Sequence, residues 1–251
     1  MNILVCISSV PDTTSPINFT NNNQSFDKNG ITFIINPYDE FCLTKAIFIK
    51  EKQSATITVL NVGNNTNDSV LRKALAIGAD NAVRINQESI NSEMVAECIV
   101  GYCQDKNFDI VFCGRESIDY NGGKVPGFIA EKLNLPFING CVGMDIKNEV
   151  IELKREIDNG HEICECSFPV LIAGQKGLVE EKDLRIPSMR GIMSARTKSL
   201  EVIEPTVNLE NKNKIKTIHY DKPIQRSECK MINEDNVEEL VDLLNNEAKV
   251  I

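Results

Sequence analysis

Short apolar segments alternate with amphipathic segments along the first 135 residues. The apolar segments are rich in β-branched residues and end at turn residues, which predicts strands at 2–9, 31–35, 55–62, 81–85 and 108–113. Helical periodicity between them predicts helices at 36–49, up to Gly78, at 92–104 and at 126–133. This alternation favours right-handed βαβ units and an α/β fold with a doubly wound, mainly parallel sheet of the Rossmann-like, adenine-nucleotide-binding type.

Local signals support the helix boundaries. Asn36 stands at an N-cap position, Pro37 follows at the first helical position, and Asp39 and Glu40 place acids in the first turn. Gly78 is a suitable residue just after a helix end.

The pattern changes after residue 135. Apolar and polar residues alternate on both sides of Asp158-Asn159-Gly160, which predicts an added β-hairpin over 149–168. Residues 169–173 are expected to return to the main sheet, whereas 174–198 and 212–231 carry little regular pattern. An amphipathic helix is predicted after Asn233. We therefore expect a nucleotide-binding α/β domain at 1–203 and a C-terminal arm at 204–251, since a long tail ending in such a helix usually reaches another surface.

Composition narrows the class of protein. The chain has 42% hydrophobic and 25% charged residues, which is ordinary for a globular protein, and its net charge of −9 disfavours nucleic acid as a partner. Its apolar runs are too short to span a bilayer, and its N-terminus looks like a strand rather than a signal peptide. A cytoplasmic location is expected.

Neither a metal site nor a catalytic group is predicted. The nine cysteines have no Cys-x-x-Cys pair, and the two histidines, His161 and His219, lack ligand spacing and a neighbouring nucleophile. The cysteines mostly stand in apolar patterns, as buried small hydrophobes do.

A ligand crevice is expected beyond the carboxyl ends of the parallel strands. Four segments should converge there, namely Cys6–Ser9, Asn36–Asp39, Val62–Asn65 and Gly114–Val125. In the last segment, Gly122 and Gly123 precede a predicted helix, so their backbone amides and Lys124 suit a phosphate. A plain βα turn explains the two glycines equally well, and the usual dinucleotide and P-loop motifs are absent.

At this point a family resemblance is evident over nearly the whole chain. The chain resembles the beta subunit of electron transfer flavoprotein in the following segments: 3–6 with Val10-Pro11-Asp12-Thr13; Ile35-Asn36-Pro37-Tyr38-Asp39-Glu40; 71–80; Gly114 with Ile118-Asp119; and Pro187-Ser188 with Gly191-Ile192-Met193 and Ala195.

The resemblance implies a heterodimer with an alpha subunit that holds most of an FAD. The beta subunit of this family carries AMP, or a second FAD in electron-bifurcating relatives. Electrons pass from dehydrogenases, such as acyl-CoA dehydrogenase, to a membrane quinone reductase or another acceptor. The implied nucleotide contacts are Cys6, Asn36, Asp39, Val62, Gly114, Arg115, Ser117, Asp119, Gly122, Gly123, Lys124 and Val125, and Tyr38 is placed to border the partner's flavin.

The family's dehydrogenase-recognition loop corresponds to a segment within 182–198, and the residues implied are Arg185, Met189, Arg190, Ile192 and Met193. Here the chain departs from the family pattern. Lys182-Asp183-Leu184 replaces Asn-Glu-Pro, Met189 replaces an anchoring leucine, Arg190 replaces proline and Ser194 replaces a lysine. Surface drift and altered partner choice explain these changes equally well.

Two alternatives to an AMP-carrying subunit stay open. The short Gly-rich loop favours AMP, but it matches neither the AMP-type nor the bifurcating pattern fully. A free-standing adenine-nucleotide enzyme or sensor is the other alternative, although the chain lacks the His-x-Gly-His and Ser-Gly-Gly-x-Asp-Ser motifs of related adenylating enzymes.

Overall fold

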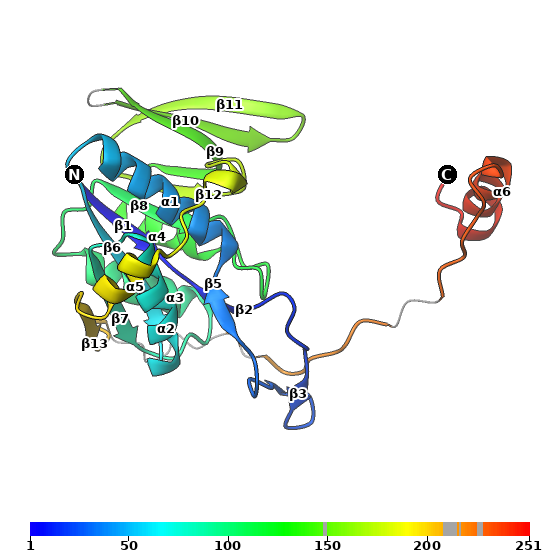
Figure 1. Cartoon of the computed structure of the whole chain (residues 1–251), viewed down its shortest axis with the longest axis horizontal. Coiled ribbons are helices and arrows are strands. Elements are labelled where there is room, and N and C mark those ends of the chain that lie inside the picture. Colours follow the sequence, from blue (N-terminus) through cyan, green and yellow to red (C-terminus); the bar gives the residue numbers. More distant parts are fainter. Residues whose placement is uncertain (148–149, 208–214, 216, 225–227) are drawn as a thin grey trace.

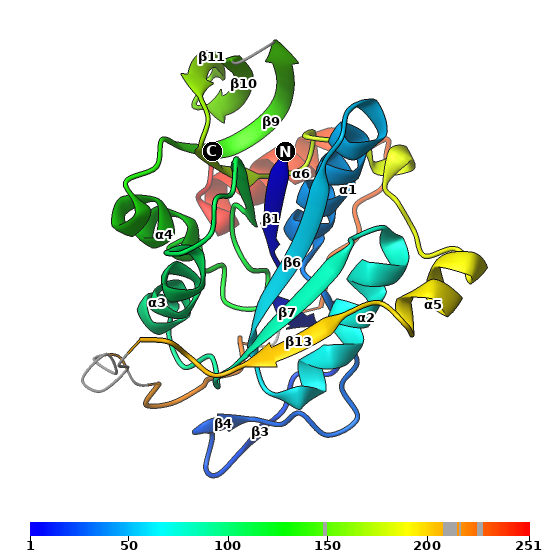
Figure 2. The ribbon, with the colours of Figure 1, turned by 90° about the vertical axis from the view of Figure 1, so that its left-hand side faces the viewer.

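The computed structural model describes residues 1–147, 150–207, 215, 217–224 and 228–251. Its main sheet has helices on both faces: α1, α2 and α5 cover one face, and α3 and α4 cover the other (Figure 1, Figure 2). The α/β fold class predicted from the alternation is therefore confirmed.

The strands of this sheet are β1 Asn2–Cys6, β6 Thr56–Gly63, β7 Asn81–Asn86, β8 Ile110–Gly114, β9 Phe137–Lys147, β10 Val150–Ile157, β11 Gly160–Ser167, β12 Val170–Gly174 and β13 Leu200–Ile203. Four short strands, β2 Ser9–Pro11, β3 Phe19–Thr20, β4 Ser25–Phe26 and β5 Phe33–Ile35, form two small antiparallel pairs, β2–β5 and β3–β4. The α-helices are α1 Pro37–Lys52, α2 Asp68–Ile77, α3 Ser92–Cys103, α4 Val125–Leu133, α5 Met189–Ala195 and α6 Val237–Asp242. Short 3₁₀ turns lie at Asn65–Asn67 and Glu181–Asp183, and a π-helical segment follows α6 at Leu243–Ala248.

The strand order places the ligand crevice. Along the sheet the order is β11-β10-β9-β12-β8-β1-β6-β7-β13, and all neighbours from β9 to β13 in this order run parallel. From β1 the chain moves outward through β6 and β7 and then returns to place β8 on the other side of β1. The strand order thus reverses between β1 and β8, and in open α/β sheets ligands bind at the carboxyl ends of the strands at such a reversal.

The central strands carry the hydrophobic core. Ile3, Leu4 and Val5 of β1 are fully buried, and Phe112 of β8 is among the largest fully buried side chains. Strands covered by helices on both faces have continuous apolar sequences. The short apolar segments of the sequence therefore predicted these strands.

One predicted strand has the wrong bounds, and some elements of the structure were not predicted. The segment 2–9 is not one strand, because the chain turns away after Ile7 and β2 pairs with β5 instead. Strand β9 was not predicted. It contains a bulge, because Gly140 has a φ of 65° and two residues of β9 stand opposite one residue of β12. The bulge interrupts the alternation of apolar and polar residues by which a strand is recognised in the sequence. Helix α5 and strand β13, in segments described above as irregular or unassigned, were also missed.

The predictions for the hairpin, the returning strand and the final helix agree with the structure. β10 and β11 form the expected hairpin with Asp158 and Asn159 at its turn, although residue 149 lies outside the described residues. β12 returns to the main sheet beside β8. The final helix is present as α6 and lies apart from the body (Figure 1). Parts of the predicted arm, at 208–214, 216 and 225–227, lie outside the described residues.

Replacing Phe112 with alanine should test the importance of the core at β8. The ring is fully buried, so the substitution leaves a cavity and should lower the free energy of unfolding by about 3–5 kcal/mol. Urea denaturation of the purified chain measures the change. Ile163→Ala is the control, because its side chain is 58% exposed on β11 and should change stability by less than about 1 kcal/mol. Equal losses for both variants would contradict this assignment of the core.

Candidate functional site

A buried carboxylate joins two strand ends at the reversal in strand order. Asp39, in the first turn of α1, is 2% exposed. Its Oδ2 accepts the backbone N–H of Ser8 at 2.7 Å, and its Oδ1 accepts that of Gly114 at 2.8 Å. The side chain therefore connects the turn after β1 to the end of β8.

Asn36 makes a second connection beside it. Its side-chain Nδ2 donates to the carbonyl of Glu116 at 2.9 Å, and its Oδ1 accepts from the backbone N–H of Ile118 at 3.3 Å. The residue stands at the N-cap position, but its side chain does not cap α1. The predicted N-cap position is confirmed, since the Asn36 carbonyl accepts the backbone N–H groups of Asp39 and Glu40, while the side-chain amide holds the loop after β8.

The segment at the end of β6 belongs to the same rim. Asn61 Nδ2 donates to the carbonyl of Ile7 at 2.8 Å, and Asn67 Nδ2 donates to Asn61 Oδ1 at 2.9 Å. Side chains of the rim pack directly against two glycines. A Cβ on Gly63 would lie 2.0 Å from Asn67 Nδ2, and a Cβ on Gly114 would lie 2.4 Å from Asp39 Oδ1. All four segments that were expected to converge thus meet at one edge of the sheet.

Burial also sets the protonation of this rim. It raises the pKa of Asp39 from the ordinary 3.8 to about 7, since a charged carboxylate loses its hydration there. The hydrogen bonds from Ser8, Asn36 and Gly114 favour the charged form and oppose this shift. Asp39 is therefore close to half-charged near neutral pH.

A cavity of ≈ 520 Å³ opens on this rim. This size suits a nucleotide-sized ligand. Its walls come from β2, the β3–β4 hairpin, β5, the segment after β6, the segment after β7, the loop after β8 and one residue of the arm, and the lining residues include Ser9, Phe19, Phe33, Asn64, Glu88, Asp119, Tyr120 and Tyr220.

The structure separates the predicted contacts into two groups. Cys6, Asn36, Asp39, Val62 and Gly114 are buried, and none of them lines the cavity. Of these, Asn36 and Asp39 hold the surrounding loops through their side-chain hydrogen bonds. Asp119 lines the cavity directly. Sequence reasoning missed the aromatic walls, although Phe19 and Phe26 stand out as apolar residues within the polar stretch 12–30.

The loop after β8 is more ordered than a plain turn. Ser117 and Gly122 exchange backbone hydrogen bonds across it, and Asn121 takes a left-handed φ of 48°. The amide of Gly122 is consequently occupied. Gly123 packs closely, since a Cβ there would lie 3.1 Å from the carbonyl of Arg115, and the Arg115 guanidinium donates to Gln175 Oε1 at 2.6 Å.

The start of α4 follows this loop. Lys124 occupies its N-cap position and is exposed, Val125 begins the helix, and among the described residues no side chain caps it. Uncapped amides at a helix N-terminus attract anions. The Gly122 amide is thus bonded within the loop, whereas no side chain in the described part of the chain caps the amides of Val125 and Gly127 at the start of α4.

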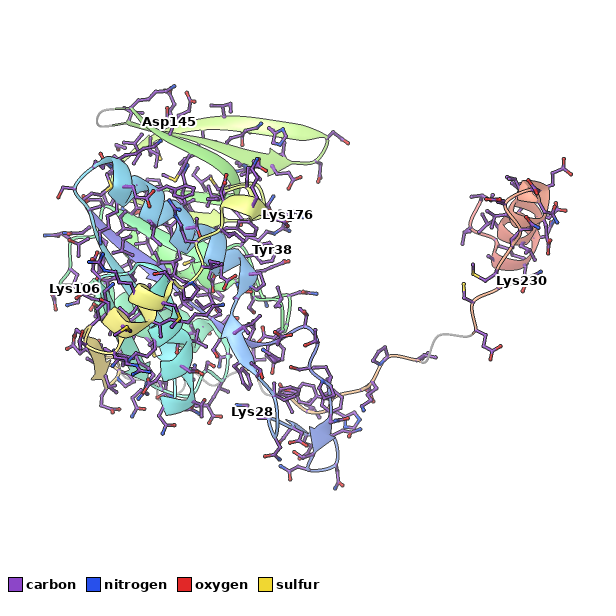
Figure 3. The ribbon with its side chains drawn as sticks, viewed as in Figure 1. Lys28, Tyr38, Lys106, Asp145, Lys176 and Lys230 are labelled. Carbon is purple, nitrogen blue, oxygen red and sulfur yellow. The ribbon has the colours of Figure 1, made fainter. Side chains whose placement is uncertain are left out.

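Tyr38 is half-buried beside Asp39. It lies in the first turn of α1, and Figure 3 shows it at that end of the helix. A Cβ on Gly114 would approach the Cβ of Tyr38 to 2.8 Å, so the two residues are in close contact.

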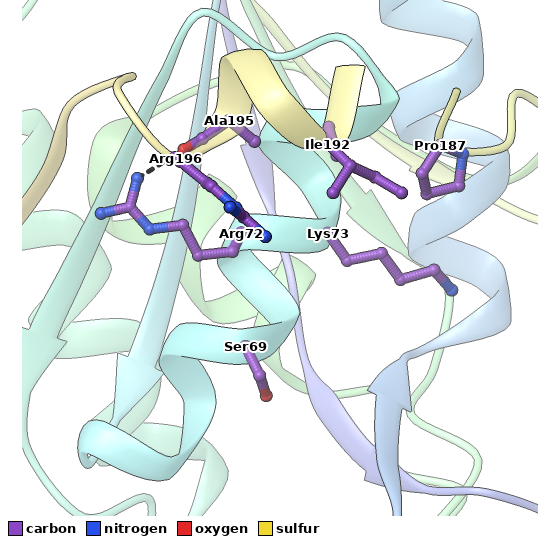
Figure 4. Close-up of a pocket in the computed structure, with 8 residues that line it drawn as sticks. Ser69, Arg72, Lys73, Pro187, Ile192, Ala195 and Arg196 are labelled. Carbon is purple, nitrogen blue, oxygen red and sulfur yellow. Dashed lines mark hydrogen bonds between the residues drawn. The ribbon is translucent and has the colours of Figure 1, made fainter. Parts of the chain in front are cut away.

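The predicted partner-recognition segment packs on α2. Arg72 Nη1 donates to the carbonyl of Ala195 at 2.7 Å (Figure 4). It also donates to the carbonyl of Lys198 at 2.8 Å. A cavity of ≈ 570 Å³ lies between α2 and residues 187–196, lined by Ser69, Arg72, Lys73, Ala76, Pro187, Ile192, Ala195 and Arg196. A Cβ on Gly191 would lie 2.3 Å from the carbonyl of Ala76, so only glycine permits this approach.

The predicted recognition residues divide into three groups. Arg185 is an anchor within the chain: its Nη2 lies 2.8 Å from Glu51 Oε1 and its guanidinium lies over the ring of Phe48. Ile192 faces the cavity on α2. Met189 and Met193 are 78% and 69% exposed, Arg190 is exposed, and Ile186, which sequence reasoning missed, is 80% exposed.

No group of three or more His, Cys, Asp or Glu side chains in the described part of the chain is placed to hold a metal ion. None of the described helices combines the length and apolar character needed to cross a membrane.

The chain is similar to known proteins over most of its length. Residues 25–208 match the model of the electron transfer flavoprotein domain. The electron transfer flavoprotein subunit beta of Bacillus subtilis (strain 168) is 35% identical, and the alignment covers 100% of both chains. The subunits beta of Thermoanaerobacterium thermosaccharolyticum and Syntrophomonas wolfei subsp. wolfei are 33% and 34% identical, covering 86% and 79% of this chain and 83% and 77% of theirs.

Asp39→Asn should destabilise the rim in a pH-dependent way. The amide turns a donor toward one of the two backbone N–H groups, which should cost about 1–3 kcal/mol near pH 5. Because the folded pKa lies above the unfolded one, the wild-type contribution is complete below pH 3.8 and is lost as pH rises through about 7.

Asparagine does not titrate, so the stability gap between the two proteins should narrow from about pH 5 to about pH 8.5. Urea denaturation at both pH values measures it. A gap that stays constant would contradict the assigned protonation of Asp39.

Proposed function

Because the chain belongs to the electron transfer flavoprotein family, we propose that it is the beta subunit of a two-subunit electron carrier. The full-length similarity to subunit beta of Bacillus subtilis carries this proposal. In this role the chain pairs with an alpha subunit that holds most of an FAD, and it serves as a carrier subunit with no catalytic side chain of its own. We expect it in the cytoplasm.

The cavity at the strand ends is the proposed site of an adenine nucleotide, with AMP as the ligand we favour. Three observations support a fit: the cavity's size, its aromatic walls, and the uncapped start of α4 at the end of the neighbouring loop. The buried residues Asn36 and Asp39 position the two loops that surround the ligand.

The FAD supplies the reversible uptake and release of electrons when it is bound. This chain's part is to bind and orient, and Tyr38, half-buried at the N-terminal end of α1, is the residue we place beside the flavin of the partner.

The C-terminal arm is the proposed contact to the alpha subunit. Helix α6 lies apart from the body and carries exposed apolar side chains, with Val237 62%, Leu240 43% and Val241 48% exposed. A helix with an exposed apolar face normally packs against another surface. Lys230, just before this helix, lies equally far from the body (Figure 3).

The surface around α5 is the proposed contact to an electron-donating dehydrogenase, such as an acyl-CoA dehydrogenase. Met189, Met193 and Ile186 expose apolar side chains on a segment that Arg72 and Arg185 hold in place. Methionine side chains adapt to varied partner pockets, and buried apolar anchors dominate binding energy at interfaces. A membrane quinone reductase is the proposed indirect acceptor.

Purifying the chain co-expressed with its alpha subunit tests the proposed function. We expect a yellow heterodimer that releases one FAD and one AMP on denaturation, measured by chromatography of the extract. Two FAD and no AMP, together with NADH-driven reduction of a low-potential acceptor, would identify the bifurcating type instead. A colourless homodimer that ignores the alpha subunit would contradict the proposal.

Met189→Ser should weaken the contact with the dehydrogenase. Loss of an exposed anchor should raise the KM for the dehydrogenase by about tenfold and leave the FAD content unchanged. Steady-state electron transfer from dehydrogenase to heterodimer measures this. Met231→Ser is the matched control, because Met231 is 86% exposed on the arm; the same KM for both variants would contradict the assignment.

A further inference from the structure

The cavity at the strand ends has one wall that belongs to the C-terminal arm. Tyr220 lines the cavity although the other lining residues all precede residue 121. Its ring stacks on Phe19 of β3, with centroids 4.9 Å apart and planes inclined by 13°. Its hydroxyl lies 3.3 Å from that of Tyr120 in the loop after β8.

This stretch of the arm is fastened to the body by polar contacts as well. The backbone N–H of Tyr220 donates to the carbonyl of Asn23 at 2.8 Å. Two residues further on, Lys222 Nζ donates to Asn18 Oδ1 at 2.9 Å. Both acceptors belong to the β3–β4 hairpin region, so the arm and this hairpin form one side of the cavity together.

The chemistry of this side favours a planar ring over a phosphate. Phe19, Phe26, Phe33, Tyr120 and Tyr220 contribute five aromatic rings to the lining. Three acids, Asp12, Glu88 and Asp119, line the cavity with a single lysine, Lys28, so the wall repels an anion. The uncapped start of α4 lies outside this lining and offers the place for a phosphate.

We propose that Tyr220, with Phe19 and Tyr120, forms an aromatic clamp by which the C-terminal arm holds the planar heteroaromatic ring of the bound nucleotide. Stacking on aromatic side chains accepts any planar ring, so the clamp serves either the adenine of AMP or a ring system of a second FAD. The arm is then part of the ligand site as well as the proposed contact to the alpha subunit. This inference rests on the proposed function, because it needs a nucleotide in the cavity.

Tyr220→Ala in the heterodimer tests the clamp. Removing the ring should raise the Kd of the nucleotide by at least about fivefold, measured by calorimetry with AMP or with FAD on heterodimer stripped of its loosely held ligand. Tyr220→Phe keeps the ring and loses the hydroxyl, so its Kd should stay within about threefold of the wild type. Ile218→Ala is the control on the same stretch, because this side chain is 80% exposed, and it should bind like the wild type.

A second variant tests whether residue 220 contacts the ring of the nucleotide or only keeps the arm in place. The chain contains no tryptophan, so Tyr220→Trp adds an indole at the clamp. The emission that this variant adds to that of the wild-type heterodimer should be quenched when AMP binds, because a stacked adenine quenches the indole; FAD is not used in this measurement, since it quenches indole by energy transfer without contact. Unchanged emission on binding would overturn the clamp.

The two proposals fail in different ways. Wild-type affinity in an intact Tyr220→Ala heterodimer would overturn the clamp and leave the proposed function in place. A wild-type heterodimer that neither retains nor binds AMP or FAD in the cavity would overturn the nucleotide assignment itself, and the clamp with it.

Discussion

The site depends on one buried carboxylate at the point where the strand order reverses. Asp39 accepts hydrogen bonds from the turn after β1 and from the end of β8, two strands that are neighbours in the sheet but more than one hundred residues apart in the chain. Burial removes the hydration of the charged carboxylate, and this loss raises the pKa of Asp39. The two hydrogen bonds from backbone N–H groups offset part of the free-energy cost of that lost hydration. Gly114 has no Cβ because the carboxylate occupies that space. The rim is thus assembled around a carboxyl group that is almost fully buried.

Helix α2 connects the two regions to which we assign function. Asn67, just before its start, lines the cavity at the strand ends and bonds to Asn61 of β6. Farther along, Arg72 and Lys73 line the second cavity, and Arg72 holds the carbonyls of Ala195 and Lys198. One rigid helix therefore supports the rim on one side and the α5 segment on the other. This arrangement suits a carrier that must present a bound group and a docking surface together.

The arm explains why such a chain is expected to work with a partner. Its final helix exposes apolar residues away from the body, while the stretch around Tyr220 returns to the cavity wall. An apolar helix face in water is unfavourable until it is covered. The same arm whose final helix exposes apolar residues therefore also forms one wall of the cavity.

The sequence by itself determined the parallel sheet, most helix positions, the hairpin at Asp158-Asn159 and the convergence of four segments at the strand ends. These features follow from the periodicity of apolar residues, from the residues that favour turns and from the right-handed crossovers between parallel strands. Only the tertiary structure decided which of the predicted residues line the cavity and which are buried outside its lining. Cys6, Asn36, Asp39 and Val62 are at the right place in the chain, but packing between elements buries them. The bulge at Gly140 and the contact of Tyr220 with Phe19 likewise depend on partners distant in the chain, and local patterns carry no information about such partners.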